Sequence, residues 1–232
     1  MKKVVLSCAV LAFGSTAMAQ SWVEGATDAG AFPAASGYQT TMGVGALTSI
    51  SGNTDTAGGD LVDAYKIRIT DPALFVATTD ESLRTLAIAD FDTRLWLFDM
   101  AGNVVMANDD LGGAPFRSWI SDPALFTNGT GTVSATMPPT ALGIGEYVLV
   151  ISGFNNDPED AFGVDLADIS TQFNALVGPD PAAGAFAAWE TGTPGSGLYT
   201  IALEGVAYAI VPAPSALALI GLGGLVATRR RR

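Results

Sequence analysis

The side chains in this sequence that are best suited to chemistry are carboxylates and amides that border expected β-strands. They are Asp60, Asp63, Asp92, Asn108, Asp109 and Asp110. Calcium binds about six to eight oxygen ligands, which these residue types supply, so their grouping predicts a calcium site. The pattern of an EF-hand loop is absent. Asx side chains also cap turns, so turn capping remains an alternative for these residues.

Catalytic chemistry has little support in the composition. The sequence has no histidine, and its single cysteine, Cys8, lies near the N-terminus. These absences exclude Ser-His-Asp and Cys-His catalysis, and cysteine zinc sites, from the body of the chain. A hydrolase that uses only carboxylates and hydroxyls stays open, because glycoside hydrolysis needs two acids about 5–10 Å apart. We expect a protein that is not an enzyme.

Three tryptophans provide a second alternative, a carbohydrate-binding module that acts on extracellular polysaccharide. Trp96, Trp119 and Trp189 could form a face on which sugars stack. Trp96 lies in an apolar segment and is expected in the core, whereas the other two are expected to pack onto the sheets from loops. The polar stretch Asn155–Asp160 is expected to be a solvated turn.

Acidic residues dominate the body of the chain. Six of the 11 basic residues lie at the two ends, and all 23 acidic residues lie between Glu24 and Glu204. A surface of this kind repels phosphate backbones and attracts divalent cations. The charge pattern therefore argues against a nucleic-acid partner.

Short strands separated by turn residues must position these side chains. Apolar residues alternate over Ala64–Ile69, as in a half-buried strand, whereas Leu95–Phe98 and Tyr147–Ser152 are apolar on both faces, as in central strands. No helical period extends beyond about ten residues. The pattern predicts an all-β fold, an antiparallel β-sandwich or jelly-roll-like domain over residues 60–208. A Gly-, Ser- and Thr-rich lead with the first strands is expected over 20–59.

One heptapeptide occurs twice in nearly the same form. It reads ITDPALF over Ile69–Phe75 and ISDPALF over Ile120–Phe126. The flanking sequences do not align well. We therefore interpret the match as a shared way of passing from a strand into a turn, with a duplicated unit as the alternative.

Three segments of the body, taken in order, carry a family resemblance. They are Asp60–Ile67, then Asp92–Asp99 with Gly102 and Asn108–Asp110, then Gly145–Gly153. Together they resemble the bacterial pre-peptidase C-terminal domain and related sandwiches of exported proteins. The resemblance implies a jelly-roll-like sandwich that accompanies enzymes without being a catalyst. It also implies that calcium can bind at loops near the sheet edge.

The N-terminus has the three parts of a signal peptide. Two lysines precede the apolar stretch Val4–Phe13, and Ala17 and Ala19 frame an A-x-A cleavage site. We expect the apolar stretch to form a helix and residues 1–19 to be removed by signal peptidase. The mature chain would then begin at Gln20.

The C-terminal residues 211–232 also have three parts. These are Pro212-Ala213-Pro214, an apolar run over Ala216–Ala227, and the arginines Arg229, Arg230, Arg231 and Arg232. The run predicts a short hydrophobic helix, well below the roughly 20 residues of a comfortable membrane span. The arginines would stay on the cytoplasmic side. An ordinary short tail anchor is the alternative to a sorting signal.

This tail resembles the PEP-CTERM sorting signal of exported bacterial proteins, with Ala213 where the family usually has glutamate. The resemblance implies recognition by an exosortase, a membrane transpeptidase-like enzyme. Removal of the tail would follow a transient membrane contact. We therefore expect an exported surface or extracellular-matrix protein with a non-catalytic, calcium-stabilised body. It would reside in the cell envelope, at the cell surface or outside the cell.

Overall fold

The computed structural model describes residues 20–112, 116–128, 131–137, 142–190, 192 and 194–210. The expected signal peptide with Ala17 and Ala19 lies outside the described residues. So do the expected terminal helices and the sorting tail with Pro212, Ala213, Pro214 and Arg229–Arg232. No helix within the described ranges is long and apolar enough to cross a bilayer.

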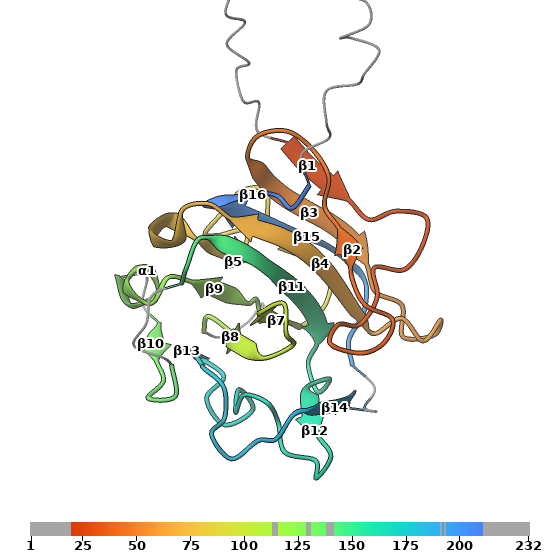
Figure 1. Ribbon diagram of the computed structural model, residues 1–232, viewed down its shortest axis with the longest axis vertical. Coiled ribbons are helices and arrows are strands. Elements are labelled where there is room, and N and C mark those ends of the chain that lie inside the picture. Colours follow the sequence, from red (N-terminus) through yellow and green to blue (C-terminus); the bar gives the residue numbers. More distant parts are fainter. Residues whose placement is uncertain are drawn as a thin grey trace, which may run out of the picture.

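Two β-sheets form the main part of the structure (Figure 1). Sheet A consists of β1 (Gln20–Val23), β3 (Leu47–Asn53), β5 (Val76–Thr78), β6 (Ile88–Ala89), β9 (Trp119–Ser121) and β15 (Leu198–Glu204). Sheet B consists of β2 (Gln39–Thr40), β4 (Val62–Ile69), β7 (Thr93–Phe98), β8 (Val104–Asn108), β11 (Gly145–Gly153) and β16 (Val206–Tyr208). The orders are β1-β3-β15-β5-β9 and β16-β4-β11-β7-β8, with β6 beside β15 and β2 beside β4.

The central pairings of both sheets are antiparallel. Strand β11 lies between β4 and β7, and β15 lies between β3 and β5, all with antiparallel register. Only edge strands depart from this pattern, because β1 pairs with β3 and β2 pairs with β4 in parallel. The predicted all-β sandwich is therefore confirmed, with mixed sheets at its edges.

The main core lies between the two sheets. Tyr65, Ile67 and Ile69 on β4 are buried there, and they share one cluster with Ile201 and Leu203 on β15. The alternation over Ala64–Ile69 selects this face, since successive side chains of a strand point to opposite sides. Strand β3 contributes to the same core, so the lead supplies part of the sandwich.

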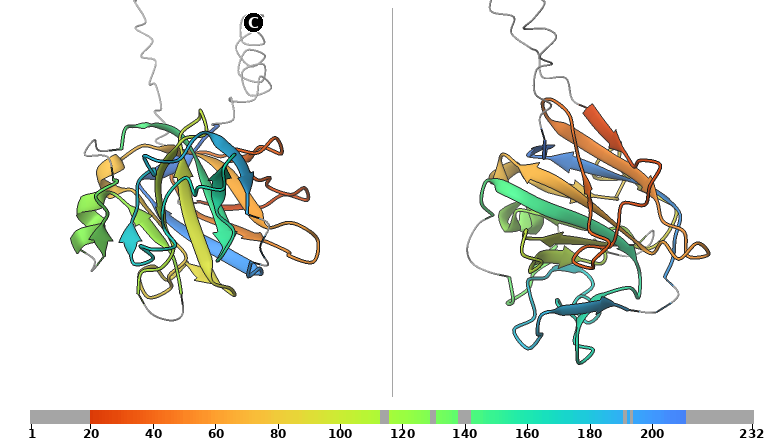
Figure 2. Two further views of the ribbon diagram at one scale, coloured as in Figure 1. Left: turned by 90° about the horizontal axis from the view of Figure 1, so that it is seen from below. Right: turned by 45° about the vertical axis from the view of Figure 1, so that its right-hand side comes forward.

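A third layer covers the outer face of sheet B, which explains the two strands that are apolar on both sides. It contains the strand pair β12 (Pro158–Asp160) and β14 (Phe186–Trp189), visible beneath the sheets in Figure 2. Strand β13 (Ala175–Leu176) belongs to it too, and pairs with β10 (Thr132–Val133). Trp96 and Val150 are fully buried against this layer. The described part of residues 163–195 forms loops and short strands without a helix.

Both copies of the heptapeptide end a strand and begin a helical turn. The first copy leaves β4 and enters the 3₁₀ turn η1 (Pro72–Leu74), and the second leaves β9 and enters α1 (Pro123–Asn128). Proline suits the first turn of a helix because its missing N–H would have no helical partner there. Phe75 and Phe126 are both fully buried. The shared sequence thus corresponds to a shared local conformation.

Candidate functional site

The structure divides the predicted calcium ligands between two separate groups of acids. Asp60 and Asp63 lie with two acids of the lead, Glu24 and Asp28. A second group contains Asp92, Asp109 and Asp110. We call the first group the N-terminal cluster, and the second, together with Arg94 and Asp157, the arginine cluster.

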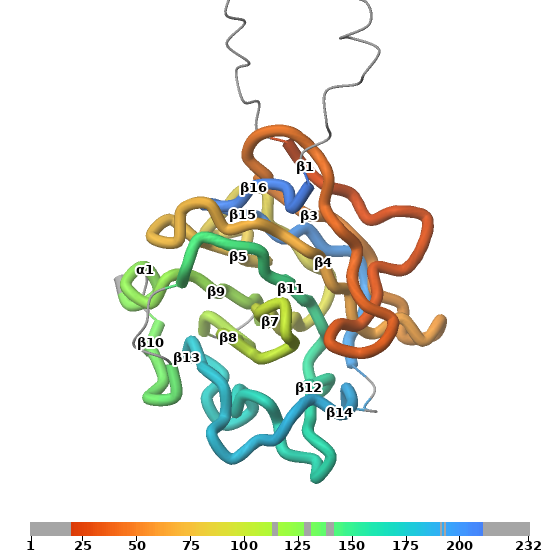
Figure 3. Tube along the Cα trace, viewed as in Figure 1, coloured from red at the N-terminus to blue at the C-terminus, as the bar shows by residue number. Residues whose placement is uncertain are grey.

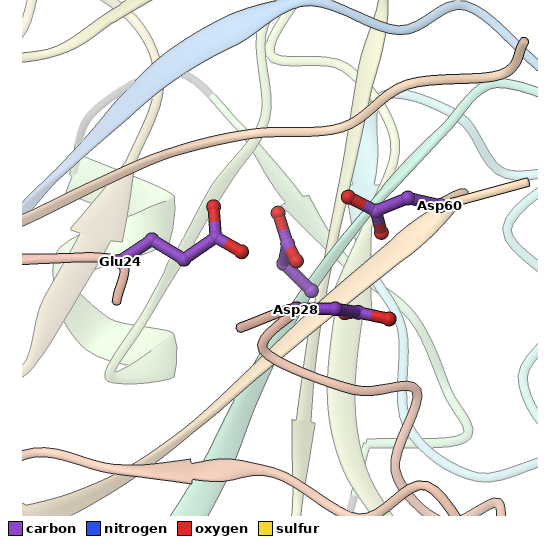
Figure 4. Close-up of side chains that lie close together, drawn as sticks. Glu24, Asp28 and Asp60 are labelled. Atoms are coloured by element: carbon purple, nitrogen blue, oxygen red, sulfur yellow. The ribbon is translucent and has the colours of Figure 1, made fainter. Parts of the chain in front are cut away.

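The N-terminal cluster lies at the end of the sandwich where β3 ends and β4 begins. Glu24 and Asp28 follow β1, whereas Asp60 and Asp63 lie just before and within β4. One carboxylate oxygen from each residue lies within 4.8 Å of the corresponding oxygen of every other. Figure 4 shows the carboxyl groups of Glu24 and Asp60 pointing toward one another from opposite sides. In Figure 3 the red segment after β1 and the orange loop before β4 lie on the same side of the molecule.

Asp63 is the buried member of this cluster, with no exposed surface. The Tyr199 hydroxyl donates to its Oδ2 atom at 2.6 Å, and the Tyr65 hydroxyl lies 2.6 Å from that of Tyr199. A phenol has one proton, so Tyr65 donates to Tyr199 when Tyr199 donates to Asp63. The Oδ1 atom of Asp63 is buried and has no hydrogen-bond partner among the described residues. One lone-pair face of the carboxylate is therefore unused.

A glycine allows this tyrosine pair to approach the backbone of β3. A Cβ atom at Gly52 would lie 2.3 Å from the Tyr199 hydroxyl and 2.7 Å from the Tyr65 hydroxyl. No side chain fits at such distances. Gly52 is thus required for the hydroxyl chain that holds Asp63 in place.

The two lead acids are held by backbone amides. Glu24 accepts hydrogen bonds from the amides of Ala29 and Asn53, at 3.2 and 3.1 Å. Asp28 accepts one from the amide of Gly30 at 2.7 Å, in an Asx turn. These bonds orient the lead carboxylates and still leave each of them with further lone pairs for another ligand.

The electrostatics of the N-terminal cluster are unfavourable to its own ionised state. Burial, followed by the charges of Asp28, Glu24 and Asp55, raises the pKa of Asp60 to about 7. Burial raises the pKa of Asp63 to about 8, although its hydrogen bond from Tyr199 acts in the opposite direction. Ion pairs found among the described residues involve none of the four acids.

The arginine cluster has its own internal cation. Arg94 is 1% exposed and lies on β7, where its guanidinium donates to Asp109 at 3.0 Å and to both carboxylate oxygens of Asp157. It also lies over the Phe154 ring, 4.6 Å from the centroid. Buried charges are tolerated when they are paired and hydrogen-bonded in this way. Arg94 thereby fastens the loop before β12 to the outer face of sheet B.

The acids beside Arg94 still have raised pKa values. Burial and the Asp109 charge raise the pKa of Asp92 to about 6. Burial and the charges of Asp109 and Asp92 raise that of Asp110 to about 7, while Arg94 acts in the opposite direction. The arginine therefore offsets part of the repulsion in this cluster, an effect that the N-terminal cluster lacks.

Asn108 has a structural role that the calcium prediction did not include. Its amide nitrogen donates to the carbonyls of Asp110, Phe173 and Ala175, and its Oδ1 accepts from the amide of Trp119 at 2.9 Å. Every polar atom of this fully buried side chain is thus engaged with backbone. Asn108 joins strand β8 to its neighbours through these bonds, and its role as a metal ligand stays a prediction.

The expectation of a solvated turn over Asn155–Asp160 is wrong. Asn156 and Asp157 are 0% and 2% exposed, and Asp157 is an ion-pair partner of Arg94. Asp160 accepts three backbone N–H groups, which lower its pKa. The polar side chains of this segment pair with Arg94 and accept hydrogen bonds from backbone N–H groups inside the protein. Their polarity alone does not predict that they are buried.

The tryptophans expected to pack do so. Trp96 is fully buried and donates to the Ser152 hydroxyl at 3.1 Å. Trp119 is 6% exposed and stacks on Phe126, although it lies on β9 where a loop was expected. Trp189 is half-buried, with edge contacts to three aromatic rings. These positions leave no shared exposed face for stacking of a sugar.

Sequence reasoning missed Glu24, Asp28, Arg94 and Asp157. Glu24 and Asp28 belong to a lead without clear periodicity, so nothing in the local pattern placed them beside β4. For Arg94 a signal existed, because it is a lone charge at the edge of the apolar run RLWLF. A buried arginine needs an acidic partner, which could have directed the search to a distant aspartate.

No protein-family model matches the chain, and no curated protein or solved structure matches it significantly. The two clusters are therefore interpreted from their own geometry. Both are groups of oxygen ligands suited to a hard cation. Only the arginine cluster contains a protein cation that substitutes for one.

Proposed function

We propose that this protein is exported and processed at both ends, and that its non-catalytic β-sandwich acts at the cell surface or in the extracellular matrix. The observation that carries this proposal is the pair of tripartite end segments. A signal peptide pattern precedes Gln20, and a short apolar run between Pro212-Ala213-Pro214 and four arginines follows the body. Signal peptidase and an exosortase would be the processing enzymes.

The arrangement of the described ends supports this proposal. The Tyr208 hydroxyl donates to the carbonyl of Ser21 at 3.1 Å, and Met42 forms a bridge with Ile210. The first and last described segments thus lie together at one end of the sandwich, near the labels β1 and β16 in Figure 1. A body joined to its targeting segments at one end can be held at a membrane and then released with both sheets intact.

A structural role for the acidic residues also supports a non-catalytic body. Arg94 and its aspartates fasten the third layer to sheet B. The N-terminal cluster lies between the lead and β4. Both clusters join segments of the fold, and calcium is the ion that we expect to stabilise a cluster that contains no protein cation.

Mass spectrometry of the native protein tests the proposal. We expect a chain that begins at Gln20, ends before Ala216 and is recovered from the envelope or the medium. Replacement of the four arginines 229–232 by glutamine should cause accumulation of a species with its tail. As the matched control, Arg68→Gln removes an exposed arginine of the body and should leave processing unchanged. A cytosolic protein with both termini intact would refute the proposal.

A further inference from the structure

We propose that Glu24, Asp28, Asp60 and Asp63 bind one calcium ion, which fastens the N-terminal lead to strand β4. This inference rests on the proposed role of calcium as a stabilising ion. It adds which residues bind the ion. It does not depend on how the chain is exported.

The spacing of the four acids suits calcium. Two oxygens on opposite sides of a calcium ion lie about 4.6–5.2 Å apart, because each bond is about 2.3–2.6 Å long. The four ligand oxygens of the cluster lie within 4.8 Å of one another. Magnesium suits the cluster less well, because it demands near-ideal octahedral geometry, usually keeps several waters and binds through one or two carboxylates.

The buried carboxylate of Asp63 provides an independent indication of a ligand. Within the part of the chain that the structure describes, its Oδ1 atom has no hydrogen-bond partner, although the side chain has no exposed surface and lies with the other three acids. A buried polar atom without a partner has a free-energy cost of about 1–3 kcal/mol, and more when it is charged. A cation between the four carboxylates would satisfy this atom, and the Tyr199 bond to Oδ2 holds the group in place while leaving Oδ1 for the ion.

An ion can reach this position from the solvent. Asp28 is exposed, and Glu24 lines an open groove on sheet A with a volume of about 620 Å³. Val23, Ile88 and Leu198 line the same groove. Buried Asp63 would therefore form the base of the site, and exposed Asp28 would close it.

The bound ion would connect parts of the chain that are far apart in sequence. Glu24 and Asp28 belong to the segment between β1 and β2, whereas Asp60 and Asp63 border the start of β4 in sheet B. Among the described strands, β1 is an edge strand whose one pairing partner is β3. We therefore expect the segment after β1 to be held less firmly without calcium, and the lead to become more protected when calcium binds.

Thermal melting of the full chain, first treated with a chelator and then supplied with calcium, tests the assignment. Calcium at one hundred times its dissociation constant should raise the melting temperature by about 5–10 °C. Magnesium at the same concentration should give a much smaller shift. Hydrogen exchange of residues 20–31 should slow in the same samples.

Three aspartate variants locate the site. Asp60→Asn should abolish most of the calcium shift, because Asp60 is half-buried in the cluster and has no side-chain hydrogen bond to lose from Oδ1. Asp110→Asn, in the arginine cluster, should retain the shift. Asp71→Asn changes an exposed aspartate without a capping bond and should match the parent chain.

Two outcomes would overturn the inference in different ways. A calcium shift that persists in Asp60→Asn and disappears in Asp110→Asn would reject this site and leave calcium as the stabilising ion. The absence of any calcium shift in the parent chain would reject the site and the calcium role together. Neither outcome would affect the export proposal, which the termini of the native protein test separately.

Discussion

The N-terminal cluster and the arginine cluster bring together similar acids in opposite electrostatic settings. In the arginine cluster, Arg94 is bonded to Asp109 and Asp157 and lies entirely within the protein. In the N-terminal cluster, the charges that raise the pKa of Asp60 and Asp63 come from other acids. The first cluster therefore carries its own counter-ion, whereas the second needs protons or a cation from the solvent.

We therefore infer that the two clusters have different structural roles. A guanidinium is a permanent partner, because its pKa keeps it charged at any physiological pH. It suits the attachment of the third layer, which covers sheet B and completes a core. A site that depends on a solvent cation gives the lead a stability that varies with the surroundings. If the protein folds after the proposed export, this dependence would link its stability to the calcium concentration outside the cell.

The largest effect should come from removal of the internal counter-ion. Arg94→Met leaves Asp109 and Asp157 buried without a cation, so the free energy of unfolding should fall by about 3–5 kcal/mol. Urea denaturation near neutral pH measures it. A loss below about 1 kcal/mol would show that Arg94 is not an essential counter-ion of the buried Asp109 and Asp157.

The next effect is a pH dependence of the calcium-free chain. The pKa of Asp63 is about 8 in the folded state and that of Asp60 about 7, against about 4 for an unfolded aspartate. Raised carboxyl pKa values favour the folded state at low pH, and this contribution is lost as pH rises from about 4 to about 8. The free energy of unfolding should fall across that window by a few kcal/mol, with most of the change from fully buried Asp63 and a smaller part from Asp60, which solvent partly screens.

Chemical denaturation over this pH range, with chelator present, measures the slope. Asp63→Asn should make the slope shallower, because the amide oxygen can still accept from Tyr199 and no longer titrates. Saturating calcium should also make it shallower, since calcium keeps the carboxylates of the N-terminal cluster ionised. The raised pKa values of Asp92 and Asp110 leave a remaining slope in both cases. The opposite result would be a chain that becomes more stable from pH 4 to 8 without calcium and keeps that slope in Asp63→Asn. It would contradict the proposal that the N-terminal cluster needs a counter-ion from the solvent.

The smallest effect should come from an exposed ion pair. Lys66 and Glu146 lie 2.7 Å apart on neighbouring strands, and the Glu146 side chain is 44% exposed. Glu146→Gln should change the free energy of unfolding by less than about 1 kcal/mol, because solvent and salt screen such pairs. A change as large as that of Arg94→Met would mean that burial does not determine how much an ion pair contributes to the stability of this protein.

Much of the sandwich could be predicted from the sequence, because strand patterns are local. The alternation over Ala64–Ile69 identified the face of β4 that lies in the core, and the two-sided apolar pattern of Leu95–Phe98 identified a central strand. The third layer was not predicted. Its strands are two to four residues long, too short for a periodic signal, and their polar loops are buried by tertiary contacts.

The make-up of the two clusters also depends on tertiary contacts that local sequence patterns do not predict. Asp60 and Asp63 lie in one cluster, which their closeness in sequence favours. Their separation from Asp92 and Asp109, and the arrival of Glu24, depend on which strands pair at each sheet edge. Register and crossover connections decide these neighbours, and a list of residue types does not contain them.

A crystal structure of the full chain grown with calcium, with the ion located by anomalous scattering, tests the contrast between the clusters most directly. We predict one ion among Glu24, Asp28, Asp60 and Asp63, with bonds of about 2.3–2.6 Å, and an unchanged Arg94 between Asp109 and Asp157. An ion seated among Asp92, Asp109 and Asp110, with no ion in the N-terminal cluster, would contradict it.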